Sequence, residues 1–95
     1  MRYKIDVKRK DINNGLCSDP NTCAVALAMQ RRFGKMAGYG GVEVEEHRAT
    51  VLFSDGDYHV DLPKRTTRFI YRFDETGNQI GARLKMKPFS FTVNM

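Results

Sequence analysis

Seven consecutive apolar residues at positions 23–29 (CAVALAM) place the strongest constraint on how this chain can fold. Pro20 suits the first turn of a helix, Ser18 or Asp19 suits the N-cap, and Gly34 suits the C-terminal end. A helix that is apolar on every side must be surrounded by other elements. The run therefore predicts a central helix that the rest of the chain covers.

The length of the chain limits how many cores it can form. Ninety-five residues, 41% of them apolar, are enough for one domain but too few for two. We therefore expect a single domain over residues 1–95. No apolar run approaches the ~20 residues that span a bilayer, and the first ten residues alternate in polarity and do not resemble a signal peptide. A cytoplasmic protein without membrane contact is expected.

The segments around the central helix alternate in the manner of strands. Tyr3, Ile5 and Val7 share one face, and residues 42–62 predict a meander that turns at the Asp-Gly pair 55–56. Residues 80–86 and 89–93 predict closing strands. A short turn from Asp11 would end at Gly15 with positive φ, and residues 36–41 would be a flexible connector. The predicted class is α+β, with an antiparallel-dominated sheet in the order β-α-β-β-β-α-β and two helices on one face.

The second predicted helix, LPKRTTRFIYRFD at positions 62–74, divides into two faces. Four residues recur at the spacing of a buried helical stripe: Thr66, Phe69, Ile70 and Phe73. Arg65, Arg68 and Arg72 recur on another face, and no acidic residue interrupts positions 64–72. The stripe predicts packing on the sheet. The arginine row is either an ordinary solvated face or an anion-binding surface.

Several motifs together resemble a type of small uncharacterised protein found in phages and their bacterial hosts. They are DINNG, two cysteines followed by AVALA, the helix segment RFIYRFD and the closing KPFSFTV, which together span nearly the whole chain. The resemblance implies a phage setting and a compact α+β fold, and it names no activity. Short phage proteins of one function are often counter-defence factors, which is an analogy that is independent of fold.

Catalytic and metal-binding patterns are weak in this sequence. Cys17, Cys23, His47 and His59 supply the residue types of a zinc site, but their spacing does not match a zinc finger. Core packing for Cys23 and exposed strand positions for the histidines are the simpler interpretations. The phosphate-loop, nucleophile-elbow and zinc-protease motifs are missing. We expect no enzyme activity, no cofactor and no metal.

Anion recognition is the remaining kind of chemistry, and the net charge of +5 fits it. Guanidinium groups bind phosphates in bidentate fashion, and aromatic rings stack on bases. Basic residues of a strand segment, Arg83, Lys85 and Lys87, would add to the row. The candidate anion ligands are Arg65, Arg68, Arg72, Lys64, Arg31 and Arg32, and the candidate stacking residues are Tyr71 and Tyr39.

These observations lead to three hypotheses of function. The first is a phage counter-defence protein of the host cytoplasm that binds and sequesters a small anionic signalling nucleotide without catalysis, with a homodimer closing the pocket. The second is an inhibitor that binds a bacterial defence protein, in the manner of an anti-CRISPR. The third is a small accessory protein that binds nucleic acid.

Overall fold

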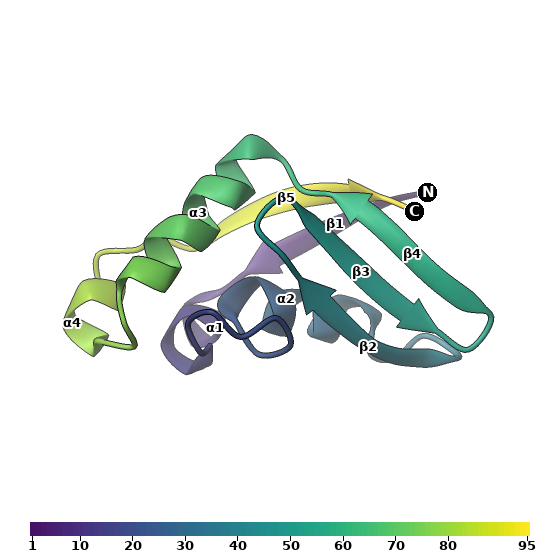
Figure 1. Ribbon diagram of the computed structural model, residues 1–95, viewed down its shortest axis with the longest axis horizontal. Helices are drawn as coiled ribbons and strands as arrows, with labels where there is room; N and C mark the ends of the chain where they lie inside the picture. Colours follow the sequence, from purple (N-terminus) through teal and green to yellow (C-terminus); the bar gives the residue numbers. More distant parts are fainter.

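The computed structural model describes residues 1–95 and contains five strands and four helices (Figure 1). The elements follow one another as β1 (Arg2–Val7), α1 (Arg9–Asn14), α2 (Ala24–Phe33), β2 (Tyr39–Val44), β3 (Arg48–Phe53), β4 (Gly56–Asp61), α3 (Lys64–Glu75), α4 (Ile80–Arg83) and β5 (Phe89–Asn94). The predicted α+β class and the antiparallel pairing of the strands are confirmed. No helix has the length and apolar character needed to cross a bilayer.

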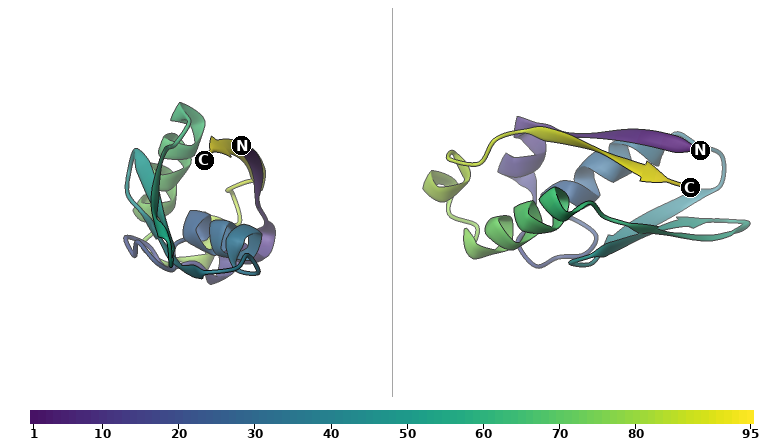
Figure 2. Two further views of the ribbon diagram at one scale, coloured as in Figure 1. Left: turned by 90° about the vertical axis from the view of Figure 1, so that its right-hand side faces the viewer. Right: turned by 90° about the horizontal axis from the view of Figure 1, so that it is seen from above.

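The strands form two sheets, where the sequence predicted one. β1 pairs with β5, placing Ile5 opposite Phe91, and β2, β3 and β4 form a separate meander. Helix α2 contacts both β1 and β2, and the end-on view in Figure 2 places it between the ribbon β1–β5 and the meander. Because α2 buries residues on most of its circumference, both sheets are needed to cover it.

The central helix begins later than its sequence predicts. Its first residue is Ala24 and its N-cap is Cys23, whereas Pro20 lies in a preceding turn. The side chain of Asp19 accepts hydrogen bonds from the backbone N–H groups of Asn21 and Thr22, at 2.9 and 3.1 Å. Asp19 therefore stabilises a separate turn ahead of the helix. The predicted end at Gly34 is confirmed.

Helix α1 is capped differently from the expected turn at Asp11. It starts after Lys8, whose backbone N–H donates to the Asp11 carboxylate at 2.8 Å. The positive φ predicted for Gly15 is wrong, because its φ is −69°. A Cβ atom at this position would lie 2.5 Å from the backbone nitrogen of Ala24. Glycine is required here by the close approach of two chain segments.

The meander agrees with its predicted pattern. The hairpin from β3 to β4 turns at the predicted place, and Gly56 has φ +142°, a conformation that favours glycine. β2 begins at Tyr39, so half of the expected flexible connector belongs to the sheet.

The strand predicted for residues 80–86 is wrong. This segment forms the single-turn helix α4, which leaves Ile80 and Leu84 exposed. It also buries Arg83, which is 4% exposed and donates to the carbonyl oxygens of Ile12 and Asn13 at 3.1 and 3.2 Å. These carbonyls lie in the last turn of α1, where partners within the helix run out. Arg83 therefore acts in the fold and is not on a polar strand face.

The stripe predicted for the second helix is confirmed in α3. Thr66, Phe69, Ile70 and Phe73 are all buried, and the rings of Phe69 and Phe73 lie 6.0 Å apart. Burial of the three apolar side chains is worth roughly 1.5–3 kcal/mol each. This packing fixes which face of α3 turns outward.

Candidate functional site

A basic groove lies along the outer side of α3. It has a volume of about 490 Å³ and is lined by nine residues. Five are basic, and the other four are apolar; they are Arg65, Arg68, Arg72, Lys85 and Lys87, with Phe69, Met86, Pro88 and Phe89. No acidic side chain lines the groove. The structure thus brings the arginine row together with two lysines that follow it in the sequence.

Two walls of different origin form this basic groove. The helical spacing of Arg65, Arg68 and Arg72 projects all three from one side of α3, because the buried stripe holds the helix in phase. The second wall is the segment between α4 and β5, which carries Lys85 and Lys87. Met86 is buried between these lysines and anchors the wall to the core.

The five cations of the groove are free to bind an anion. All five are exposed, and none is part of an ion pair. Arg65 alone has a protein partner, the backbone carbonyl oxygen of Ser90 on β5. Like charges that line one groove repel one another, so an anion that bridges them relieves that repulsion.

The floor of the groove is aromatic. Phe69 is buried and its ring centroid lies 4.7 Å from that of Phe89, which is only partly buried. Low-polarity surface beneath the cations strengthens their electrostatic interactions and offers a flat ring to a ligand. The closing Pro-Phe-x-Phe motif was the sequence signal for Phe89, but nothing local in the sequence placed that motif beside α3.

Arg31 and Arg32 are not brought to the groove. The guanidinium of Arg31 donates to both oxygens of the buried Asp11, each at 2.7 Å, and to the backbone oxygen of Asp6. The hydrogen bonds with Asp11 raise the pKa of Arg31. Arg32 stacks over Tyr3, 4.9 Å from the ring centroid. Both side chains therefore support the packing of α2 against β1 and α1.

The other sequence candidates also lie outside the groove. Lys64 is the first residue of α3 and is exposed, but it does not line the groove. The Tyr71 hydroxyl donates to Glu46 at 2.7 Å, which turns that ring toward the meander. Tyr39 packs edge-on against Phe53, and its hydroxyl is buried without a partner. Phe69 and Phe89 take the place of these tyrosines as the aromatic groups next to the cations.

The zinc interpretation finds no converging ligands. No group of three or more His, Cys, Asp or Glu side chains is arranged to hold a metal ion. The Cys17 thiol donates to the carbonyl of Phe73 at 2.9 Å, and His59 pairs with Thr50 at 3.0 Å. Cys23 is buried at the start of α2.

Comparison with known proteins adds no homology to this geometry. No protein-family model, curated protein or solved structure matches the chain.

Proposed function

We propose that the protein binds a small phosphate-bearing nucleotide in the basic groove and does not alter it. The observation that carries this proposal is the set of five basic side chains that form no ion pair and lie over an aromatic floor, without any carboxylate among them. A phosphate has the charge and the oxygen geometry that neighbouring guanidinium groups recognise.

The two walls have different roles in this proposal. Arg65, Arg68 and Arg72 hold phosphate oxygens through paired N–H donors, and the lysines contribute charge from the opposite wall. The base lies against Phe89, the partly exposed ring of the floor. A ligand with two phosphates fits the number of cations better than one with a single phosphate.

Binding without turnover is supported by the side chains that line the groove. None of the nine is Asp, Glu, His, Cys, Ser or Tyr, so the lining offers no carboxylate, imidazole, thiol or hydroxyl as a general base or nucleophile, and its two lysines are exposed to water. Such a protein acts by lowering the free concentration of its ligand. Its effect then depends on the amount of protein present and on its affinity.

The biological setting of the proposal rests on the motif resemblance. A phage protein that holds a signalling nucleotide in the host cytoplasm would silence a defence pathway that the nucleotide activates. A homodimer would close the groove, which is open to solvent in one chain, and bury more of the ligand. The phage setting and the homodimer are separate from nucleotide binding itself.

The test is a titration of linear and cyclic nucleotides by calorimetry, with the triple variant R65Q/R68Q/R72Q as comparison. Each lost charge-assisted contact should cost roughly 1.5–3 kcal/mol, or about one to two decades in affinity. The matched control is R2Q/K10Q/K35Q, which removes the same charge from exposed positions outside the groove. The proposal fails if the triple variant binds as tightly as the control.

The same row of cations also suits a nucleic-acid backbone. In that case affinity for a mixed-sequence oligonucleotide would exceed that for any mononucleotide or dinucleotide and would fall steeply with salt. A flat nucleotide screen together with a stable complex with a bacterial protein would instead favour a protein-binding inhibitor. These outcomes separate the three hypotheses in one set of measurements.

A further inference from the structure

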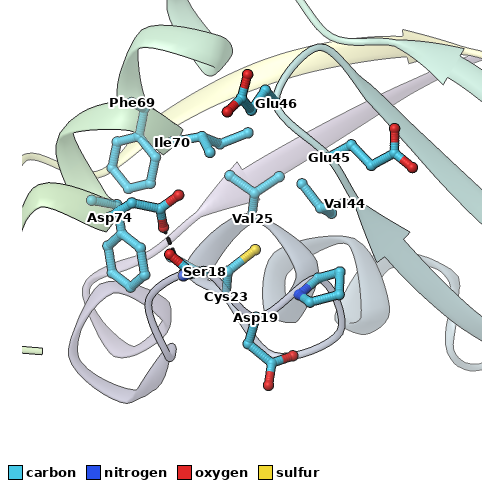
Figure 3. A pocket seen from close by; sticks show the side chains of 13 residues that line it. Ser18, Asp19, Cys23, Val25, Val44, Glu45, Glu46, Phe69, Ile70 and Asp74 are labelled. Carbon is cyan, nitrogen blue, oxygen red and sulfur yellow. Dashed lines mark hydrogen bonds between the residues drawn. The ribbon is translucent and has the colours of Figure 1, made fainter. Parts of the chain in front are cut away.

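A second hollow lies on the other side of α3, between that helix, the loop that precedes α2 and the end of β2 (Figure 3). Its volume is about 300 Å³. Unlike the basic groove, it is lined by no lysine, arginine or histidine. Its rim carries four carboxylates, from Asp19, Glu45, Glu46 and Asp74. In a chain of net charge +5, such an uncompensated acidic rim needs an explanation.

The acidic hollow is built on the hydrophobic core. Val25, Val44, Ile70 and Phe73 line it and are each at least nine-tenths buried. In Figure 3 the side chains of Val25, Val44 and Ile70 point toward one another, with Glu45 and Glu46 above them, Asp74 to one side and Asp19 below, its carboxylate directed away from them. A ligand that fills this space therefore meets apolar surface at its body and negative charge at its end.

The carboxylates are held in place by neutral donors. Asp74 accepts the backbone N–H of Ser18 at 2.9 Å, and Asp19 accepts those of the turn that follows it. Glu46 accepts the Tyr71 hydroxyl, and the His47 imidazole lies 4.0 Å from its carboxylate. Glu45 has no side-chain hydrogen bond or ion pair. The rim is thus partly preorganised, and its charge is largely unneutralised.

A buried thiol faces the same space. Cys23 is 6% exposed and lines the hollow, and Figure 3 shows its sulfur directed into it. It occupies the N-cap position of α2, but its side chain makes no capping hydrogen bond. The backbone N–H groups of Val25 and Ala26 act on this sulfur from the helix side, and a ligand N–H group in the hollow would add a donor from the open side.

We propose that this hollow binds an organic cation, an ammonium or guanidinium group carried on an apolar chain. The carboxylates attract the cation, and the aliphatic chain occupies the apolar floor. A metal ion fits less well, because no three of the acidic, thiol or imidazole groups converge on one point. The volume lies at the lower end of the range for small-molecule sites, which suits a short, unbranched amine.

The experiment uses three six-carbon probes with the same chain. n-Hexylamine, hexan-1-ol and hexanoate are titrated into the 15N,13C-labelled protein and followed by methyl NMR shifts. The amine is expected to bind at least tenfold more tightly than the alcohol, and hexanoate is expected not to bind. The methyl signals of Val25, Val44 and Ile70 should move. Equal affinity for amine and alcohol, or shifts confined to other methyl groups, would overturn the proposal.

Charge-matched variants locate the cation. E45Q/E46Q removes two rim carboxylates and should weaken hexylamine binding at least tenfold. E43Q/D57N removes the same charge from exposed positions that do not line the hollow, and it should leave the affinity within twofold. The fold of each variant is checked by its amide spectrum. If both variants bind hexylamine as the wild type does, the acidic rim has no part in recognition.

Discussion

The two hollows on either side of α3 have opposite charge and are built in opposite ways. The basic groove is formed by long, exposed side chains that can adapt to a ligand. The acidic hollow is formed by short carboxylates, two of which are fixed by backbone N–H groups, over a closed apolar floor. A ligand must order the side chains of the first, whereas the second is partly in place before binding. Ordering each long side chain costs about 0.5–1.5 kcal/mol.

One helix can serve both sites because its buried stripe sets its rotation. Phe69 lines both the basic groove and the acidic hollow, and it is 8% exposed. The arginines project to one side of this ring, and Ile70, Phe73 and Asp74 line the hollow on the other. The buried stripe of α3 therefore also keeps the basic groove and the acidic hollow on opposite sides of the helix.

The largest expected effect comes from removing this shared wall. Phe69→Ala should lower the free energy of unfolding by about 3 kcal/mol, since a buried phenylalanine is replaced by a cavity. It should also weaken nucleotide and alkylamine binding together. Urea unfolding and the two titrations measure these effects. Phe69→Leu is the control and should retain much of the stability; loss of only one ligand in Phe69→Ala would show that the ring is not a shared wall.

The next largest loss of stability is expected when Arg31, which supports the fold, is replaced. Replacing an arginine of the basic groove should change the stability much less. Arg31→Met leaves the carboxylate of Asp11, which is 2% exposed, without its cation. Because Arg31 itself is partly exposed, we expect a loss of about 2 kcal/mol, below the range for a fully buried pair. Arg68→Gln should change the stability by no more than about 0.5 kcal/mol. Nucleotide titration should give the reverse order, with Arg68→Gln weakened and Arg31→Met unchanged.

The two cysteines should give opposite responses to alkaline pH. Burial, with a further contribution from Asp74 and Asp19, raises the pKa of Cys23 above its ordinary 9.0. Burial also opposes ionisation of Cys17, but hydrogen bonds from Thr76 and Arg83 outweigh it and lower the pKa of that thiol. A raised pKa in the folded state stabilises the protein below the unfolded value, and this stability is lost as the pH rises above about 9.

Unfolding by urea between pH 7 and 10.5 tests this difference. Cys23→Ala should flatten the fall of stability above pH 9. Cys17→Ala should leave that fall unchanged and should instead remove a rise in stability below pH 9, because the lowered pKa of Cys17 adds stability as the pH rises from its folded pKa toward 9.0. Each thiol can change the slope by at most about 1.4 kcal/mol per pH unit. Identical slopes in both variants would contradict the assigned directions.

The sequence predicted those parts of the molecule that periodicity controls. The α2 helix, the meander and the α3 stripe follow from the order of apolar and polar residues alone. In each of them the buried side chains are mainly the apolar ones. Residues 80–86 misled the prediction, since apolar residues at every second position also fit a turn of helix that leaves Ile80 exposed. Which carbonyls Arg83 would reach depends on tertiary contacts across more than sixty residues.

The sequence predicted the arginine wall of the basic groove but not how the second wall is formed. Helical spacing placed Arg65, Arg68 and Arg72 together, and Lys85 and Lys87 were expected to add to them from a strand; the wall that carries the lysines is formed instead by the path of the chain after α4. Arg31 looked equivalent to the row in sequence, and only the fold shows its pairing with Asp11. The acidic hollow combines three separate segments, so no local pattern could have indicated it.

The smallest expected effect concerns Tyr71, on the acidic side of α3. Its hydroxyl donates to Glu46, and this bond raises the pKa of the phenol. Tyr71 is 44% exposed, so Tyr71→Phe should change the stability very little. Nucleotide affinity should not change, because the ring lies outside the basic groove. Hexylamine affinity should rise by up to about threefold, since a Glu46 oxygen loses its donor and can accept from the ammonium group. Tyr58→Phe, also at an exposed ring, is the control for loss of a hydroxyl. A fall in nucleotide affinity in Tyr71→Phe alone would show that the Tyr71 hydroxyl contacts the nucleotide, and the two sides of α3 would then form one site.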